Sequence, residues 1–185
     1  MRRLSYFLLK LGGWKVEKTI PKEATRAVLV VAPHTSMWDF YYGKLAMIWM
    51  GLNVRYLIKK ESFFFPIGYF LRKMGAIPVD RQQVRKFPLH VAKLFEQHEE
   101  LTIMIAPEGT RQRTDHWKKG FYFIATQANV PIVLAYMDWK KRVGGIGKVI
   151  YPSGNYEQDL KEIHDFYRGM QGKHKGQFNL ENDDE

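Results

Sequence analysis

The sequence contains no cysteine among its 185 residues. Disulfide bonds, a thiolate nucleophile and sulfur-ligated metal sites are therefore excluded, and a reducing compartment suits this composition. No apolar run approaches the roughly 18 residues that a membrane-spanning helix needs. The His-Glu-x-x-His pattern and comparable metal signatures are also missing from the sequence. We therefore expect no transmembrane helix, no metal site and no bound cofactor.

The charge is strongly positive. Lys and Arg number 29 against 19 Asp and Glu, which gives a formal net charge of +10. Such an excess favours an anionic partner, which is a nucleic acid, anionic lipid headgroups, or an acidic protein or substrate. Because the sequence has no stacking platform, zinc module or helix-turn-helix signature, only the net charge favours nucleic acid, and we expect no nucleic-acid partner.

Apolar, β-branched runs alternate with helical spacings along the chain. Strands are predicted at 27–32, 54–58, 76–79, 101–106, 131–138 and 143–151. Helices are predicted at 36–50, 82–100, 120–129 and 156–169, with an interrupted aromatic segment at 61–73. This alternation predicts an α/β fold, a single-domain mixed and mostly parallel sheet flanked by helices, with functional residues in the loops beyond the strand ends.

Three segments divide the chain. Residues 1–20 contain a short amphipathic helix, which either lies in a membrane interface or packs on the domain. It begins with two basic residues, followed by the apolar residues Leu4, Phe7, Leu8 and Leu11. Residues 21–170 form the main domain. Residues 171–185 are polar and predict a disordered tail. The aromatic run at 63–71 is expected to be core, with any surplus lining an apolar slot or contacting lipid.

A histidine and an aspartate follow the first predicted strand of the main domain, in the segment His34-Thr-Ser-Met-Trp-Asp39. A carboxylate that fixes the tautomer of an imidazole makes the other ring nitrogen a general base for a hydroxyl proton. The alternative interpretation is a turn histidine followed by a helix-capping aspartate.

Two further segments also place polar residues directly after predicted strands. Pro107-Glu-Gly-Thr-Arg111 combines a tight turn and a hydroxyl with a planar guanidinium suited to phosphate or carboxylate. Its alternative is a polar turn with an exposed pair between Glu108 and Arg111. The segment Gly75-Ala-Ile-Pro-Val-Asp-Arg81 ends in an acidic–basic pair, and its alternative is a turn in which Asp80 caps a helix.

Four segments, in their order and spacing, resemble the glycerolphosphate acyltransferase family, and specifically its lysophosphatidic acid acyltransferase branch. They are the His-x4-Asp segment, the Gly-x-Ile-x-Val-Asp-Arg segment, Pro-Glu-Gly-Thr-Arg and the apolar strand that starts at Val130. The resemblance covers roughly 27–138. Two departures, Pro33 before the histidine and Ala106 before the Pro-Glu-Gly-Thr-Arg segment, indicate a divergent branch.

The resemblance implies roles for individual residues. His34 is the expected general base and Asp39 its support. Arg111 is expected to hold the phosphate of the acceptor, in a loop shaped by Glu108, Gly109 and Thr110. Arg81 is similar to a family arginine of the same phosphate site, and Lys60 matches a basic residue upstream of a Pro-x-Gly element, which here is Pro66-Ile-Gly68.

The resemblance also implies a reaction in phospholipid biosynthesis. A fatty acyl group moves from acyl-CoA or acyl carrier protein, as co-substrate, to the hydroxyl of a lysophospholipid such as 1-acylglycerol-3-phosphate, by direct attack without an acyl-enzyme. The expected partners are the donor, the lysophospholipid and anionic lipids of a membrane surface, with a cytoplasmic, peripheral location on the inner face of the cell membrane. A phosphate-free lyso-lipid acceptor and a non-catalytic lipid-binding scaffold are the alternatives.

Overall fold

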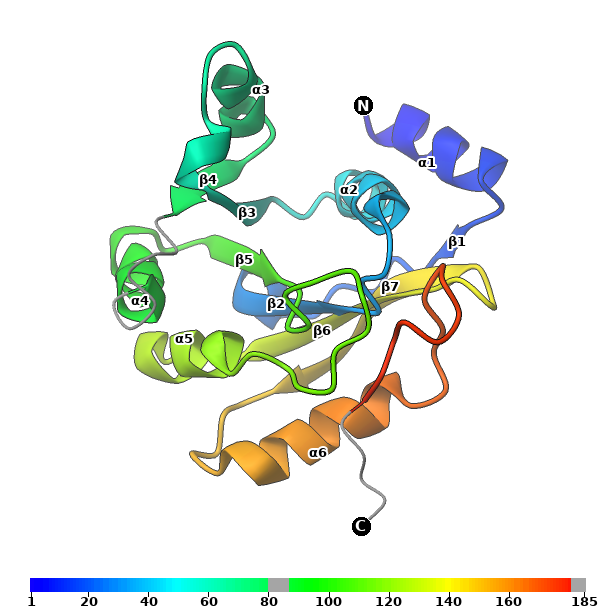
Figure 1. Ribbon diagram of the computed structural model, residues 1–185. Coiled ribbons are helices and arrows are strands. Elements are labelled where there is room, and N and C mark those ends of the chain that lie inside the picture. The colour runs from blue at the N-terminus through cyan, green and yellow to red at the C-terminus, as the bar shows by residue number, and fades with distance from the viewer. Residues whose placement is uncertain (80–86, 181–185) are drawn as a thin grey trace.

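A computed structural model of the protein describes residues 1–79 and 87–180, which form one seven-stranded sheet with helices on both faces (Figure 1). The strands are β1 (Lys15–Val16), β2 (Arg26–Ala32), β3 (Val54–Lys59), β4 (Ala76–Val79), β5 (Leu101–Ile105), β6 (Ile132–Asp138) and β7 (Val143–Ile150). The helices are α1 (Arg2–Leu11), η1 (Lys22–Thr25), α2 (Met37–Met50), η2 (Lys60–Ser62), α3 (Ile67–Lys73), α4 (Phe87–Gln97), α5 (Gly120–Ala128) and α6 (Tyr156–Tyr167).

The strand order is β1-β7-β6-β2-β5-β3-β4. All neighbouring strands run parallel except β6 and β7, which form an antiparallel pair. The predicted mixed, mostly parallel sheet is therefore confirmed. Strand β2 lies between β5 and β6, and the carboxyl ends of these three parallel strands meet at one edge of the sheet.

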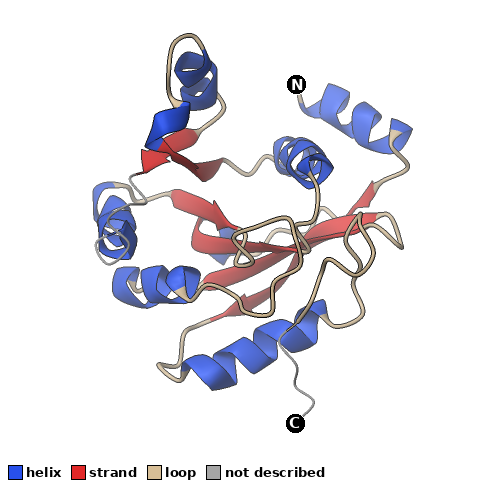
Figure 2. Cartoon of the chain, viewed as in Figure 1, coloured by secondary structure: helices blue, strands red, loops and turns tan. Residues whose placement is uncertain are grey.

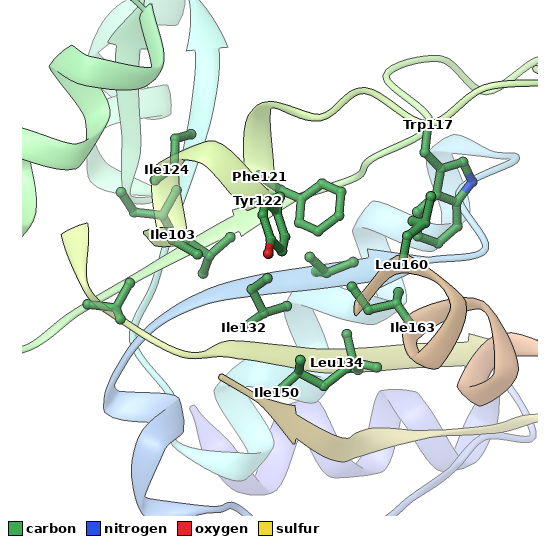
Figure 3. Packing of buried hydrophobic residues seen from close by; sticks show 14 of the residues in the cluster. Ile103, Trp117, Phe121, Tyr122, Ile124, Ile132, Leu134, Ile150, Leu160 and Ile163 are labelled. Carbon is green, nitrogen blue, oxygen red and sulfur yellow. The ribbon is translucent and has the colours of Figure 1, made fainter. Parts of the chain in front are cut away.

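The central strand is buried on both faces, which explains its continuous apolar sequence. On one face Leu29 packs with α2, through Ala46 and Met47. On the other, Val28 and Val30 belong to a larger cluster with residues of α4, α5 and α6. Figure 2 shows the helices on the two faces of the sheet, and Figure 3 shows side chains of the larger cluster, which include Phe121, Ile132 and Ile163.

Several predicted boundaries differ from the structure. The aromatic segment at 61–73 divides into η2 and α3, and the described part of the helix predicted at 82–100 is α4. The short elements β1 and η1 were not predicted, because two to four residues carry no readable periodicity. No helix in residues 1–79 or 87–180 has the length and apolar character needed to cross a bilayer.

The N-terminal helix contacts the domain through one face and exposes another. Leu9 is buried in a small cluster with Trp14 and Met137, whereas Leu4, Phe7 and Leu11 stay exposed. At the other end of the chain, residues 171–180, for which the sequence predicts a disordered tail, lie against the domain. Phe178 and Leu180 pack against the larger cluster.

Candidate active site

Loops from three neighbouring strands meet at the carboxyl edge of the sheet. His34 follows β2, Glu108 and Arg111 follow β5, and Trp139 follows β6. Parallel strands that lie side by side bring the loops after them together. The sheet order therefore juxtaposes segments that are far apart in the chain, as in the hydrogen bonds from His34 to Glu108, across 74 residues, and from Trp139 to Asp39, across 100 residues.

Asp39 supports both the start of α2 and the histidine. Its Oδ2 accepts hydrogen bonds from the backbone N–H of Thr35 (2.6 Å) and Ser36 (2.7 Å). With Ser36 as N-cap, this arrangement is a capping box. His34 Nδ1 lies 3.7 Å from the same oxygen, an ion-pair distance rather than a hydrogen bond. The helix-capping role that was the alternative interpretation of Asp39 is thus confirmed, and the same carboxylate faces the imidazole.

The second carboxylate oxygen of Asp39 has a different partner. Trp139 Nε1 donates a 2.6 Å hydrogen bond to Oδ1 across 100 residues of sequence. Asp39 is buried, so an ionised side chain there depends on these donors to replace water. Three N–H groups bond to this carboxylate, two from the helix cap and one from the indole.

Glu108 turns inward from its loop. Its Oε2 and Oε1 lie 2.9 and 3.2 Å from the backbone N of His34, which donates to the carboxylate. The side chain is buried, which excludes the alternative of an exposed pair with Arg111. Burial, with a smaller contribution from the negative charge of Asp39, raises the pKa of Glu108 to about 8, although the hydrogen bond from His34 acts in the opposite direction. Glu108 therefore fixes the backbone of the histidine.

The rest of the loop is shaped by a glycine in the left-handed region. Gly109 has φ +65°, and a Cβ there would lie 2.6 Å from Lys118 Cε. Thr110 Oγ1 accepts a hydrogen bond from the backbone N–H of Gln112 (3.2 Å), which tightens the turn. Arg111 is exposed and forms no ion pair with a carboxylate of residues 1–79 or 87–180, so its guanidinium is available to an anionic ligand.

A cavity of about 1060 Å³ opens beside these loops. His34, Asp39, Gly109, Thr110 and Arg111 line its polar part. Its apolar walls come from α2, β3, β5 and α5, and include Phe40, Met47, Leu57, Met104, Phe121 and Ile124. The volume is at the upper end of the roughly 300–1,000 Å³ of small-molecule sites, so the cavity suits an elongated amphiphile with one polar end.

Opposing effects act on His34. Burial is the largest and lowers the pKa of the imidazole; Asp39 raises it and Arg111 lowers it. The net effect lowers the pKa below 6.5, so the neutral imidazole predominates at neutral pH. The site therefore combines a neutral base, a buried carboxylate and a free guanidinium around one cavity.

Two residues predicted for the site are not placed in it. Lys60 lies in η2, is exposed, and does not line the cavity. Asp80 and Arg81 lie outside the described residues. The aromatic segment at 63–71 does not line the cavity either. No group of three or more His, Asp or Glu side chains within 1–79 and 87–180 is arranged to hold a metal ion.

Trp139 and Lys118 belong to the surroundings of the site and were not predicted. Neither lies in a recognisable motif. Trp139 directly follows a strand that the sequence does predict, so the rule that functional residues follow the carboxyl ends of parallel strands could have indicated it. Lys118 packs on Gly109 only because the loop folds back, with the N–H of Lys118 donating to the carbonyl of Pro107 (2.8 Å).

Comparisons with known proteins agree with this arrangement. Residues 14–138 match the family model described as Acyltransferase. The 1-acyl-sn-glycerol-3-phosphate acyltransferase beta of Homo sapiens is 29% identical over 147 residues, covering 72% of this chain and 48% of the human protein. The chain thus spans about half the length of that curated relative.

A solved structure shares the fold. The crystal structure of the 1-acyl-sn-glycerophosphate (LPA) acyltransferase PlsC from Thermotoga maritima superposes with a TM-score of 0.59 at 15% sequence identity. The match covers 92% of this chain and 80% of that chain.

Proposed function

This chain belongs to the acyltransferase family, and we propose that it is an O-acyltransferase that moves a fatty acyl group from a thioester donor to the hydroxyl of a lysophospholipid. The observation that carries the proposal is that His34 and Arg111 line the same large, mostly apolar cavity. A base and an anion-binding group at the polar end of an apolar cavity match a substrate with a hydroxyl, a phosphate and an acyl chain.

The reaction proceeds by direct attack. Because His34 Nδ1 faces Asp39, Nε2 takes the proton of the acceptor hydroxyl while that oxygen attacks the thioester carbonyl carbon. The new C–O bond forms, the C–S bond breaks, and the departing thiolate receives the proton from the imidazolium. No acyl-enzyme is needed, in keeping with the absence of cysteine.

Arg111 holds the acceptor through its phosphate, as 1-acylglycerol-3-phosphate would present it. The guanidinium offers a planar set of donors that matches two phosphate oxygens. Gly109 and Thr110 shape the loop that carries it, and Glu108 ties that loop to the histidine. Arg81 and Lys60 are also proposed to bind this phosphate. The donor is acyl-CoA or acyl carrier protein, and either acidic donor suits the net charge of +10.

We also propose that the enzyme works as a peripheral protein on the cytoplasmic face of the cell membrane. An amphiphilic patch, defined here as the exposed side chains of α1, of α3 and of Phe65 in the turn before α3, supports this proposal. Its apolar members are Leu4, Phe7, Leu11, Phe65, Tyr69 and Phe70. Arg2, Arg3, Arg72 and Lys73 lie on the same two helices.

The two helices flank α2. Tyr6 of α1 stacks on Trp49 of α2 at 4.5 Å between ring centroids, and Lys44 of α2 donates to the carbonyl of Met74, which follows α3 (2.9 Å). Figure 1 shows α1 and α3 at the same end of the molecule. Exposed aromatic side chains combined with Lys and Arg suit a membrane interface with anionic lipids, where each cation contributes about 1 kcal/mol.

The proposal is tested by the release of free thiol from acyl-CoA and from acyl carrier protein. Each donor is offered with lysophosphatidate and with a phosphate-free lyso-lipid, and His34→Ala serves as the blank. We expect release that needs lysophosphatidate and disappears in the variant. Circular dichroism of His34→Ala verifies that the variant is folded.

Other outcomes separate the alternatives. Release with only the phosphate-free acceptor would retain the chemistry and reject the phosphate role of Arg111. Vesicle binding without thiol release from any donor–acceptor pair would favour a non-catalytic lipid-binding scaffold. Full turnover by folded His34→Ala protein would reject His34 as the base.

A further inference from the structure

We propose that Trp139 is a positioning residue that orients Asp39, and through it the His34 imidazole, by the hydrogen bond from its indole N–H to Asp39 Oδ1. The proposal rests on the proposed function of this site and adds a residue from outside the family motifs identified in the sequence. Trp139 does not line the cavity, so it acts through Asp39 and has no contact with substrate.

The geometry of the carboxylate explains why a third donor matters. The backbone N–H groups of Thr35 and Ser36 both donate to Oδ2, and neither donates to Oδ1. A carboxylate held at one oxygen can still rotate about that oxygen, and this rotation would change the direction in which it faces His34 Nδ1. The 2.6 Å bond from Trp139 holds Oδ1 and thereby fixes the plane of the carboxylate. Oδ2 then stays 3.7 Å from Nδ1, ready to shorten to a hydrogen bond when substrate binds.

The indole is itself held on several sides. Its ring contacts Trp14 edge-on, with centroids 5.0 Å apart, and Tyr42 at 5.8 Å. The guanidinium of Arg142 lies 4.7 Å from the ring centroid. The backbone N–H of Trp139 donates to the carbonyl of Gln171 (2.9 Å). A side chain with these contacts has little rotameric freedom, as a positioning group requires.

The C-terminal segment joins Trp139 to the turn that carries the histidine. Lys173 Nζ lies 5.3 Å from the Trp139 ring and 4.9 Å from the Trp38 ring. The backbone N–H of His174 donates to Thr35 Oγ1 (3.3 Å). Residues 171–174 therefore contact both the indole and the residue after His34, which fixes the two ends of the Trp139–Asp39–His34 chain relative to each other.

A matched pair of variants tests the proposal. Trp139→Phe removes the indole N–H and keeps an aromatic ring. Trp14→Phe is the control, because Trp14 is buried in the same aromatic cluster but its Nε1 has no hydrogen-bond partner among the described residues. Both changes remove similar volume from the cluster, and only the first removes a donor to Asp39.

The first readout is the titration of His34, followed by NMR in the absence of substrate. The charged groups that act on the imidazole are Asp39 and Arg111. Glu108, with its raised pKa of about 8, is the titratable group beside it, and Lys173 and Arg142 lie over the indole. Without the indole donor the carboxylate can rotate away from Nδ1. Because the negative charge of Asp39 raises the pKa of His34, we expect Trp139→Phe to lower that pKa by roughly half a pH unit. Trp14→Phe should leave the titration unchanged.

The second readout is steady-state kinetics. We expect Trp139→Phe to lower kcat on the order of 10-fold with KM for donor and acceptor within about twofold, far below the ~10⁴-fold cost of losing an orienting aspartate outright. Equal effects of the two variants on the His34 titration, or none from either, would overturn the proposal. If thiol release is never observed but Trp139→Phe alone shifts the titration, the proposed function fails while the positioning contact stands.

Discussion

The backbone N–H of His34 donates a 2.9 Å hydrogen bond to the carboxyl group of Glu108, whose side chain is only 4% exposed. This contact joins the loop after β2 to the loop after β5. A glutamate that would ordinarily be a surface residue thus becomes part of the support of the proposed base. Because Glu108 lies three residues before Arg111, the same contact sets the position of the guanidinium that we propose binds the acceptor phosphate relative to the histidine.

Glu108→Gln should change how stability depends on pH. The pKa of Glu108 is raised to about 8, so the folded state binds the proton more tightly than the unfolded state. This group therefore stabilises the fold at low pH, and the stabilisation is lost as the pH rises from about 4.5 to about 8. The amide carbonyl of Gln can still accept the His34 N–H without titrating.

Urea denaturation at pH 5, 6, 7 and 8 measures this effect. The stability of Glu108→Gln relative to the natural protein should rise with pH, by on the order of a few kcal/mol over the range. A difference between the two proteins that stays constant from pH 5 to pH 8 would contradict a buried, titrating carboxyl group.

Asp39→Asn and Arg111→Gln should shift the acid limb of the rate profile in opposite directions. Burial lowers the pKa of His34 below 6.5, Asp39 raises it and Arg111 lowers it. Removal of the negative charge should therefore move the limb to lower pH, and removal of the positive charge should move it to higher pH. The measurement is kcat/KM of thiol release between pH 4.5 and 8. Shifts in the same direction for both variants would reject His34 as the group that titrates.

Substitutions of Gly43 test whether the acyl chain of the donor binds in the cavity. Gly43 lies within α2 and lines the cavity, and a Cβ at this position would meet nothing within 4 Å. Gly43→Ala should stabilise the helix by about 0.5–1 kcal/mol and leave activity nearly unchanged. Gly43→Phe should fill the apolar space and reduce turnover of long acyl donors more than that of short ones. Equal losses for donors of all lengths would show that the acyl chain lies elsewhere.

The amphiphilic patch should govern vesicle binding. Phe65 and Phe70 are 92% and 59% exposed, so the double substitution Phe65→Ser, Phe70→Ser should leave the fold intact and weaken flotation with vesicles of anionic phospholipid by about 10-fold or more. Tyr151→Ser is the matched control, because Tyr151 is 65% exposed at the end of β7 and outside the patch. Equal binding by the double variant and the control would contradict the membrane role of α3.

The α/β class, most element positions and the family could be predicted from the amino-acid sequence alone. Apolar runs such as 27–32 identify buried strands by composition alone, and the His-x4-Asp and Pro-Glu-Gly-Thr-Arg segments carry their chemistry in short stretches of chain. The capping role of Asp39 could also be recognised in the sequence, because the N–H groups that donate to its carboxylate belong to residues three and four positions earlier.

The set of residues that meet at the site could not be predicted in this way, because it depends on how the strands pair. The inward turn of Glu108, the bond from Trp139 to Asp39 and the cavity walls all depend on the sheet order, which places β5 and β6 on either side of β2. Local periodicity reports the environment of each strand but not its neighbours. A hydrogen bond across 100 residues, such as that of Trp139, leaves no local pattern, since its geometry arises when separate strands pair and their ends align.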